Sequence, residues 1–160
     1  MQKKSTLKFS TAISAMIVCG LLAATPPARA DDDVATCTNR TLRGDYGFTV
    51  EGLILTAPGP PIPPGAAIPL RGVAMTHFDG RGNLTQVDHV VVGGVPPPVE
   101  WTAGSGPYTV NSDCSGTAVI TIPGNPLSPV RLHFVVVKQG KEIHTVVEAN
   151  AVTSIGIKVE

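Results

Sequence analysis

The sequence predicts an all-β protein, most simply a single antiparallel up-and-down β-barrel of about eight strands. Three observations support this fold class. Helical periodicity is absent after residue 30, runs of β-branched and aromatic residues recur, and clusters of Gly, Pro, Asn and Asp separate those runs. An open β-sandwich with the same strand order is the alternative. A barrel closes its own sheet edges, and its interior is either filled by side chains or holds one small ligand.

The first 30 residues have the pattern of an export signal peptide. Lysines precede an apolar stretch around residues 12–24, and Ala28 and Ala30 flank an A-x-A cleavage site. We expect cleavage after Ala30, which leaves residues 31–160 as a single domain in a secreted or periplasmic protein. No later segment approaches the roughly 20 apolar residues of a membrane-spanning helix, so we expect no membrane span in the mature chain.

The charge of the mature chain argues against nucleic acid as a partner. Export removes four of the twelve basic residues and none of the twelve acidic ones, which leaves a formal charge of −4. Phosphate backbones require clustered Lys and Arg, and the mature chain has no such cluster.

Two cysteines, Cys37 and Cys114, remain after the signal peptide. In an oxidising compartment two thiols in a small domain form a disulfide by default. Neither cysteine belongs to a C-x-x-C pair and no histidine lies at ligand spacing, so these residues do not indicate a metal site.

The first strand is expected over residues 42–55, with Tyr46, Phe48 and Val50 on one face. Further strands are expected in three runs, at residues 107–110, 116–122 and 152–159.

Two hairpins can be registered residue by residue. In the segment 78–84, a type I turn followed by a left-handed Gly82 places Asp79 opposite Asn83, and hence Phe78 opposite Leu84. In the segment 137–142, a two-residue turn at Gln139 and Gly140 places Lys138 opposite Lys141.

The register of the hairpin around residues 137–142 assigns the side chains of its two strands to two opposite faces. The predicted core face carries Leu132, Phe134, Val136, Ile143, Thr145 and Val147. The other face is expected to be solvated and carries Arg131, His133, Val135, Glu142, His144, Val146 and Glu148. His133 and His144 are diagonal neighbours there, but we interpret them as solvated strand residues rather than as metal ligands.

Alternating strand directions sort the connections between the two ends of the barrel. The loops 57–69, 93–100 and 123–129 fall at one end, and the turns 79–83, 111–116 and 139–140 fall at the other. Both cysteines then lie at the end with the turns. A separate strand at residues 100–102 would put them at opposite ends, so the segment 99–106 is expected to be a long loop or part of one interrupted strand.

The hairpin over residues 70–92 leaves open which face points inward. If Phe78 and Leu84 face inward, Gln86 and Asp88 line the interior; otherwise His77 and His89 do. A buried polar group must find a partner, and a bound ligand is one possible partner.

Three motifs occur in order along the chain: CTNRTLRGDYGF at residues 37–48, FDGRGNL at 78–84 and GPYTVNSDCSG at 106–116. In this trio the chain resembles a set of small exported bacterial proteins of uncharacterised function. By architecture alone, the predicted barrel is also similar to calycin and allene-oxide-cyclase-like barrels. That second similarity implies no catalytic residue, because fold does not determine function.

The predicted function is that of a non-enzymatic exported barrel that binds a small apolar or amphipathic ligand at its proline-rich rim, with no cofactor and no metal. The residues expected to contact the ligand are Tyr46, Phe48, Phe78, Gln86, Asp88, Tyr108 and Phe134 inside the barrel and Trp101 at its mouth. The alternative is a protein-interaction module with a packed barrel, whose loops 57–69 and 93–100 contact a partner. A barrel isomerase or cyclase that uses Asp88 as acid or base is a third hypothesis.

Overall fold

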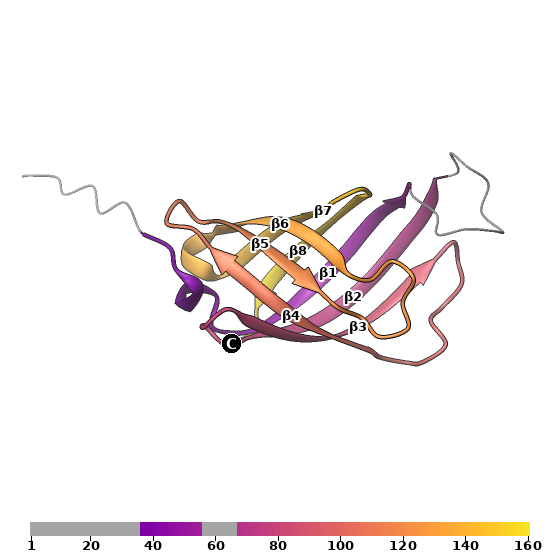
Figure 1. Cartoon of the computed structure of the whole chain (residues 1–160), viewed down its shortest axis with the longest axis horizontal. Coiled ribbons are helices and arrows are strands. Elements are labelled where there is room, and N and C mark those ends of the chain that lie inside the picture. Colours follow the sequence, from indigo (N-terminus) through magenta and orange to yellow (C-terminus); the bar gives the residue numbers. More distant parts are fainter. Residues whose placement is uncertain (1–35, 56–66) are drawn as a thin grey trace, which may run out of the picture. The chain divides into compact units, whose positions relative to one another are not determined.

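Eight antiparallel strands form a closed barrel in which each strand pairs with its neighbours in sequence and β8 pairs with β1 (Figure 1). This computed structural model describes residues 36–55 and 67–160. The pairing of β8 with β1 confirms the up-and-down barrel and excludes the open sandwich. The strands are β1 (Gly44–Ile54), β2 (Ile68–Phe78), β3 (Asn83–Val92), β4 (Thr102–Val110), β5 (Ser115–Ile120), β6 (Val130–Val137), β7 (Glu142–Val147) and β8 (Ala151–Lys158).

Two short 3-10 turns, η1 (Asn39–Leu42) and η2 (Lys138–Gly140), complete the secondary structure of the described residues. Within this part of the chain, no helix has the length and apolar character needed to cross a membrane. The predicted signal peptide with its cleavage site, and most of the proline-rich loop 57–69, lie outside the described residues.

The connections sort between the two ends of the barrel as predicted. The β3–β4, β5–β6 and β7–β8 connections lie at one end, where β1 also ends and β2 begins; this end is called here the loop end. The other three connections lie at the opposite end, called the tight-turn end (Figure 1). The Cys37–Cys114 disulfide is confirmed at the tight-turn end, with its Cα atoms 5.0 Å apart.

The β2–β3 hairpin has the predicted register, but its turn type is different. Phe78 lies opposite Leu84, and the Asp79 amide donates to the Asn83 carbonyl at 3.0 Å. Gly80 has a φ of 74°, which rules out the predicted type I turn. The cause is the Asp79 carboxylate, since its Oδ1 accepts the backbone N–H groups of Arg81, Gly82 and Asn83 at 2.6–3.0 Å and the loop curls around it.

The β6–β7 hairpin follows the prediction closely. Val137 lies opposite Glu142, and the Lys141 amide donates to the Lys138 carbonyl across the turn. Gln139 and Gly140 both have positive φ angles, of 57° and 85°, as the two central residues of a type I′ turn require.

Two strands begin two or more residues away from the predicted position. The first strand begins at Gly44 rather than at residue 42, because the chain before it forms η1, which buries Leu42 at the tight-turn end. β4 is one continuous strand that begins at Thr102, five residues before the expected start. Pro107 lies inside this strand, where it pairs with Asn83 of β3, and the ladder to β5 is interrupted beside it.

The inward face of the β2–β3 hairpin is the one that carries Phe78 and Leu84. Both residues are buried, as are Thr76 and Asp88 on the same face, whereas His77 is exposed on the outer wall. The predicted core face of β6 and β7 also points inward, with Phe134, Val136 and Ile143 buried.

Candidate functional site

The half of the barrel interior next to the tight turns is packed with aromatic side chains. Tyr46, Phe78 and Tyr108 stack edge to face, with ring centroids 5.4 Å and 4.9 Å apart for successive pairs. Phe48 and Phe134 belong to the same buried cluster. Five of the predicted ligand contacts therefore belong to one buried cluster, and these five aromatic residues are called here the aromatic plug.

The polar ends of the plug are hydrogen-bonded within the protein. The Tyr46 hydroxyl donates to the carbonyl of Gly140 in the β6–β7 turn, and the Tyr108 hydroxyl donates to the carbonyl of Asn39 at 3.0 Å. Burial, with a smaller contribution from Tyr108, raises the pKa of Tyr46 to about 12. The hydroxyl therefore stays protonated at physiological pH and serves as a donor.

A narrow polar level follows the plug along the barrel axis. On β3, Gln86 donates from Nε2 to Oδ2 of Asp88 at 2.7 Å, and Asp88 is only 7% exposed. Across the interior, the hydroxyls of Thr145 and Ser154 form a hydrogen bond of 2.6 Å. The structure thus brings the predicted pair Gln86 and Asp88 together, inside the barrel and on the loop side of the aromatic plug.

Burial raises the pKa of Asp88, and the hydrogen bond from Gln86 offsets this only in part. Its folded pKa thus exceeds its unfolded value of about 3.9, so the folded state binds the proton more tightly. We expect the free energy of unfolding to fall as the pH rises through this window. The Asp88→Asn variant has no carboxyl group to ionise at this buried position. It should therefore gain stability relative to the wild type as the pH rises from about 3 to about 7.

Urea unfolding of both proteins across that pH range measures the effect. Asp79→Asn is the matched control, because loop hydrogen bonds lower the pKa of Asp79 and the sign is reversed: this variant should lose relative stability as the pH rises. A stability difference between Asp88→Asn and wild type that does not vary with pH would contradict the assignment.

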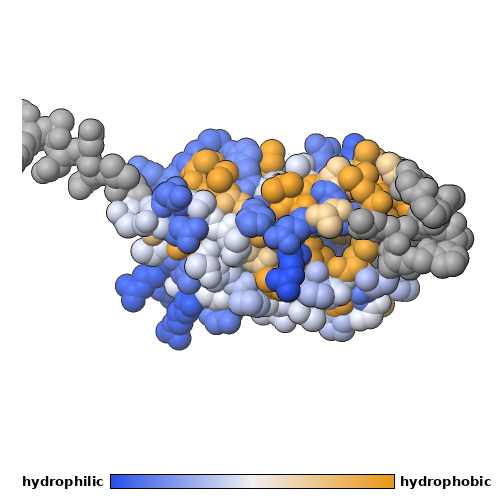
Figure 2. Space-filling model, turned by 45° about the horizontal axis from the view of Figure 1, so that its top comes forward, coloured by the Kyte–Doolittle hydropathy of each residue, from blue (hydrophilic) through white to orange (hydrophobic). Residues whose placement is uncertain are grey.

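The half of the interior next to the loops is lined by aliphatic residues. Ile54, Leu70 and Val152 form its buried part. Several inward-facing neighbours are only partly buried, namely Val50, Ile68, Val90, Val92, Val130, Leu132 and Val147. Figure 2 shows hydrophobic side chains gathered at this end of the barrel. The aliphatic residues at the loop end are therefore partly or fully buried, whereas the aromatic residues of the plug are all buried.

Trp101 lies at the loop end, as predicted, but outside the barrel. It immediately precedes β4, it is 51% exposed, and its ring packs edge-on against His89 with centroids 6.2 Å apart. His89 points away from the interior because it follows the inward-facing Asp88 on β3. Trp101 thus marks the outer wall near the mouth and not the lining of the mouth.

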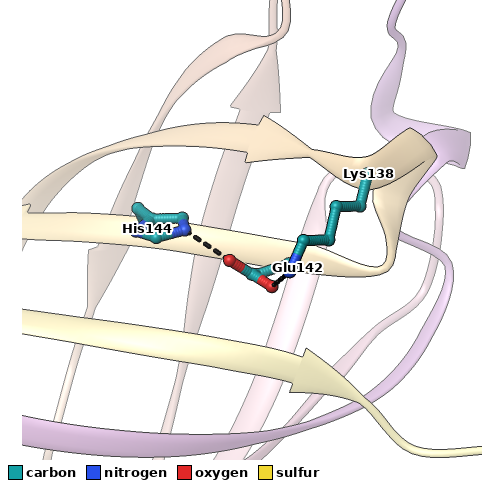
Figure 3. A network of polar contacts seen from close by, with 3 residues as sticks. All are labelled: Lys138, Glu142 and His144. Carbon is teal, nitrogen blue, oxygen red and sulfur yellow. Dashed lines mark hydrogen bonds and ion pairs between the residues drawn. The ribbon is translucent and has the colours of Figure 1, made fainter.

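The outer face of β6 and β7 carries the histidines that could be considered as metal ligands. Glu142 accepts hydrogen bonds from Lys138 Nζ and, at 2.7 Å, from His144 Nε2, each through a different oxygen (Figure 3). These two partners hold the pKa of Glu142 below its usual value. His133 pairs with a different carboxylate, that of Glu148, at 2.9 Å. Among the described residues, no three His, Cys, Asp or Glu side chains are grouped closely enough to hold a metal ion.

Sequence reasoning missed the aliphatic lining of the loop-end half. Val50, Val90 and Val147 share the inward faces of the predicted strands, so their orientation follows from the alternation pattern. Their incomplete burial does not, because it depends on how far the barrel is filled at each level.

Comparison of the chain with protein-family models, with curated proteins and with solved structures finds no match.

Proposed function

We propose that the barrel binds a small apolar or amphipathic molecule in the loop-end half of its interior. The observation that carries this proposal is the partial burial of several aliphatic side chains that face inward toward the loops, among them Val50, Val90 and Val147, beside the buried cluster of the same half. A solvent-accessible aliphatic lining inside a closed barrel is the usual setting for a small-ligand site.

The polar level supports an amphipathic ligand. Aliphatic walls provide the apolar area, and Gln86, Asp88, Thr145 and Ser154 form a hydrogen-bonding floor above the plug. An amphipathic ligand would match both the aliphatic walls and the polar floor. Its apolar part would fill the mouth, and its hydroxyl, amide or amino group would reach the floor. In this proposal the aromatic residues support the floor, and Gln86 and Asp88 contact the ligand.

The experiment fills the mouth with a large side chain. Val147 faces inward on β7 and is partly buried, whereas its neighbour Val146 faces outward and is 47% exposed. We expect Val147→Trp to weaken the binding of anilinonaphthalene sulfonate and of lauric acid by about tenfold or more, because the indole occupies the ligand volume. Val146→Trp should bind both probes as the wild type does, with fluorescence titration and calorimetry as the readouts.

The opposite result would show a filled mouth. In that case the wild type binds neither probe, and Val147→Trp lowers the free energy of unfolding by about 1–3 kcal/mol through overpacking. That outcome would favour the second candidate function, a protein-interaction module with a packed barrel. The exposed apolar residues Val95, Val99 and Trp101 in and beside the loop 93–100 are the observation that supports this alternative.

We further propose that the protein works in a secreted or periplasmic setting. The Cys37–Cys114 disulfide supports this, since such bonds persist in oxidising compartments, and the N-terminal signal pattern agrees with it. Sequencing of the exported protein from its N-terminus, expected to begin at Asp31, tests the cleavage site.

A further inference from the structure

The outer wall formed by β8, β1, β2 and β3 carries a group of exposed apolar side chains. Ile155, Ile157, Val73, Met75 and Val87 point outward and are each 40–50% exposed. The strand registers align them: Ile157, Gly47, Met75 and Val87 form one row across the four strands, and Ile155, Thr49 and Val73 form the next. Contiguous exposed apolar surface of this kind marks an interaction site more often than scattered residues do.

Two charge pairs bracket the middle of this face. Asp45 and His77 face each other across β1 and β2 at the tight-turn side, with 2.7 Å between Oδ1 and Nδ1. Glu51 and Arg71 face each other at the loop side, with 3.7 Å between Oε2 and Nε. In both pairs the acid is on β1 and the base is on β2.

We propose that this face joins two copies of the chain in a symmetric dimer, with the two-fold axis running along the strands above the β1–β2 boundary. Such an axis lays β1 of each copy over β2 of the other at the same height along the strands. Each Glu51 then meets the partner's Arg71, and each Asp45 meets the partner's His77. At the loop side the charges alternate in sign and attract, and at the tight-turn side the Asp45 carboxylate faces the partner's imidazole, which can donate a hydrogen bond.

The apolar middle of the face fits the same arrangement. Met75 of one copy comes to lie over Gly47 of the other, and an added Cβ at Gly47 would have no neighbour within 4 Å, so the space above it is open. Ile157 and the partner's Val87 meet on the flanks. In this row each protruding side chain therefore finds a glycine or another apolar residue opposite it. In the next row Val73 lies over the partner's Thr49, and Ile155 lies over the partner's His89.

The charge pattern also excludes the other simple symmetric arrangement. A two-fold axis across the strands would place Glu51 over the partner's Asp45, which brings two carboxylates together. A shallow groove of about 310 Å³, lined by Glu51, Leu53, Arg71 and Thr153 among others, gives the partner's long side chains room at the loop side. The dimer does not depend on ligand binding, because this face lies on the opposite side of the wall from the barrel interior.

The decisive experiment mixes two charge variants, Glu51→Arg and Arg71→Glu. Each variant is produced from the full chain and purified in the form to which the cell processes it. Alone, each variant places like charges at both 51–71 contacts of its homodimer, so its dimer dissociation constant should rise about tenfold. In the mixture, the arginine introduced at position 51 of the first variant meets the glutamate introduced at position 71 of the second. The unchanged Arg71 of the first variant meets the unchanged Glu51 of the second. Native mass spectrometry should therefore show a heterodimer in excess over both homodimers.

Met75→Lys tests the apolar centre, with Val135→Lys on the outer face of β6 as the matched control because Val135 is similarly exposed at 48%. Sedimentation equilibrium should show a concentration-dependent dimer for the wild type and for Val135→Lys, and a monomer for Met75→Lys. Circular dichroism confirms that each variant is folded. A wild type that stays monomeric at all concentrations, equal loss of dimer in both lysine variants, or charge variants that fail to pair on mixing would each overturn the proposal.

Discussion

Replacing Cys37 and Cys114 by serine is expected to lower the free energy of unfolding by about 4 kcal/mol, the largest effect of any change considered for this protein. The disulfide joins residues that are 77 positions apart, and closing a loop of that length removes much of the conformational freedom of the unfolded chain. For a domain of this size, such a loss is a large part of the total stability.

The bond also holds the segment before β1 against the tight-turn end. Besides the disulfide, the Cys37 amide donates to the Ser112 carbonyl at 3.2 Å, and the Val110 amide donates to the Asn39 side chain at 2.7 Å. These contacts place Leu42, which is fully buried, over the aromatic plug. Loss of the bond should therefore loosen this end before the loop end.

Urea unfolding with and without a reductant measures the effect. The wild type should lose stability when the reductant is added, and the double serine variant should not respond, which separates loss of the bond from any effect of the serine side chains. An unchanged wild-type midpoint in reductant, with the thiols shown to be free, would mean that the bond contributes nothing to stability.

Gly156→Ala is expected to destabilise the barrel by about 1–3 kcal/mol, since it introduces a methyl group into occupied space. Gly156 lies on β8 opposite Phe48 of β1, at the seam where the last strand closes on the first. A Cβ at this position would come within 2.4 Å of two atoms of the Phe48 ring. The ring would have to leave its place in the plug, and the seam would lose its cross-strand packing.

Gly47→Ala is the matched control, since Gly47 lies on β1 with nothing within 4 Å of an added Cβ. Its φ is ordinary for a strand, so alanine there should be neutral or stabilise the protein by up to about 1 kcal/mol. Both variants are compared by urea unfolding at a protein concentration low enough to keep the chain monomeric. Equal stability of the two variants would show that the Phe48 ring tolerates the added methyl group.

Local sequence patterns are sufficient to predict most of the fold, because strand alternation and turn type depend on residues that are close together in the chain. The alternation in residues 132–147 identifies the inward face, and the residues available at Gln139 and Gly140 allow the two-residue turn that sets the register. The alternating strand directions then place the three long loops at one end of the barrel, and the three tight turns and both cysteines at the other end. The turn after Asp79 was predicted less well, because the carboxylate's hydrogen bonds to its own loop outweigh the usual turn preference.

The candidate site was predicted only in part. The pair Gln86 and Asp88 was among the expected interior residues, but the alternation of the 70–92 hairpin permits either face to point inward. Both faces carry apolar and ionisable residues, so the choice depends on contacts with Tyr46 and Tyr108 from other strands. The partial burial of the aliphatic residues at the loop end likewise depends on how side chains from all eight strands fill each level.

The sequence by itself determined the all-β class, the strand order, the hairpin registers and the end at which the disulfide lies, because each follows from neighbours along the chain or from one covalent constraint. Only the tertiary structure decided where the aromatic plug lies in the interior, that Trp101 lies outside the mouth, and that Ile157 and Met75 share one outer row. These features arise when β8 closes on β1 and residues from distant strands occupy a common volume. Patterns among neighbouring residues in the sequence cannot predict such contacts.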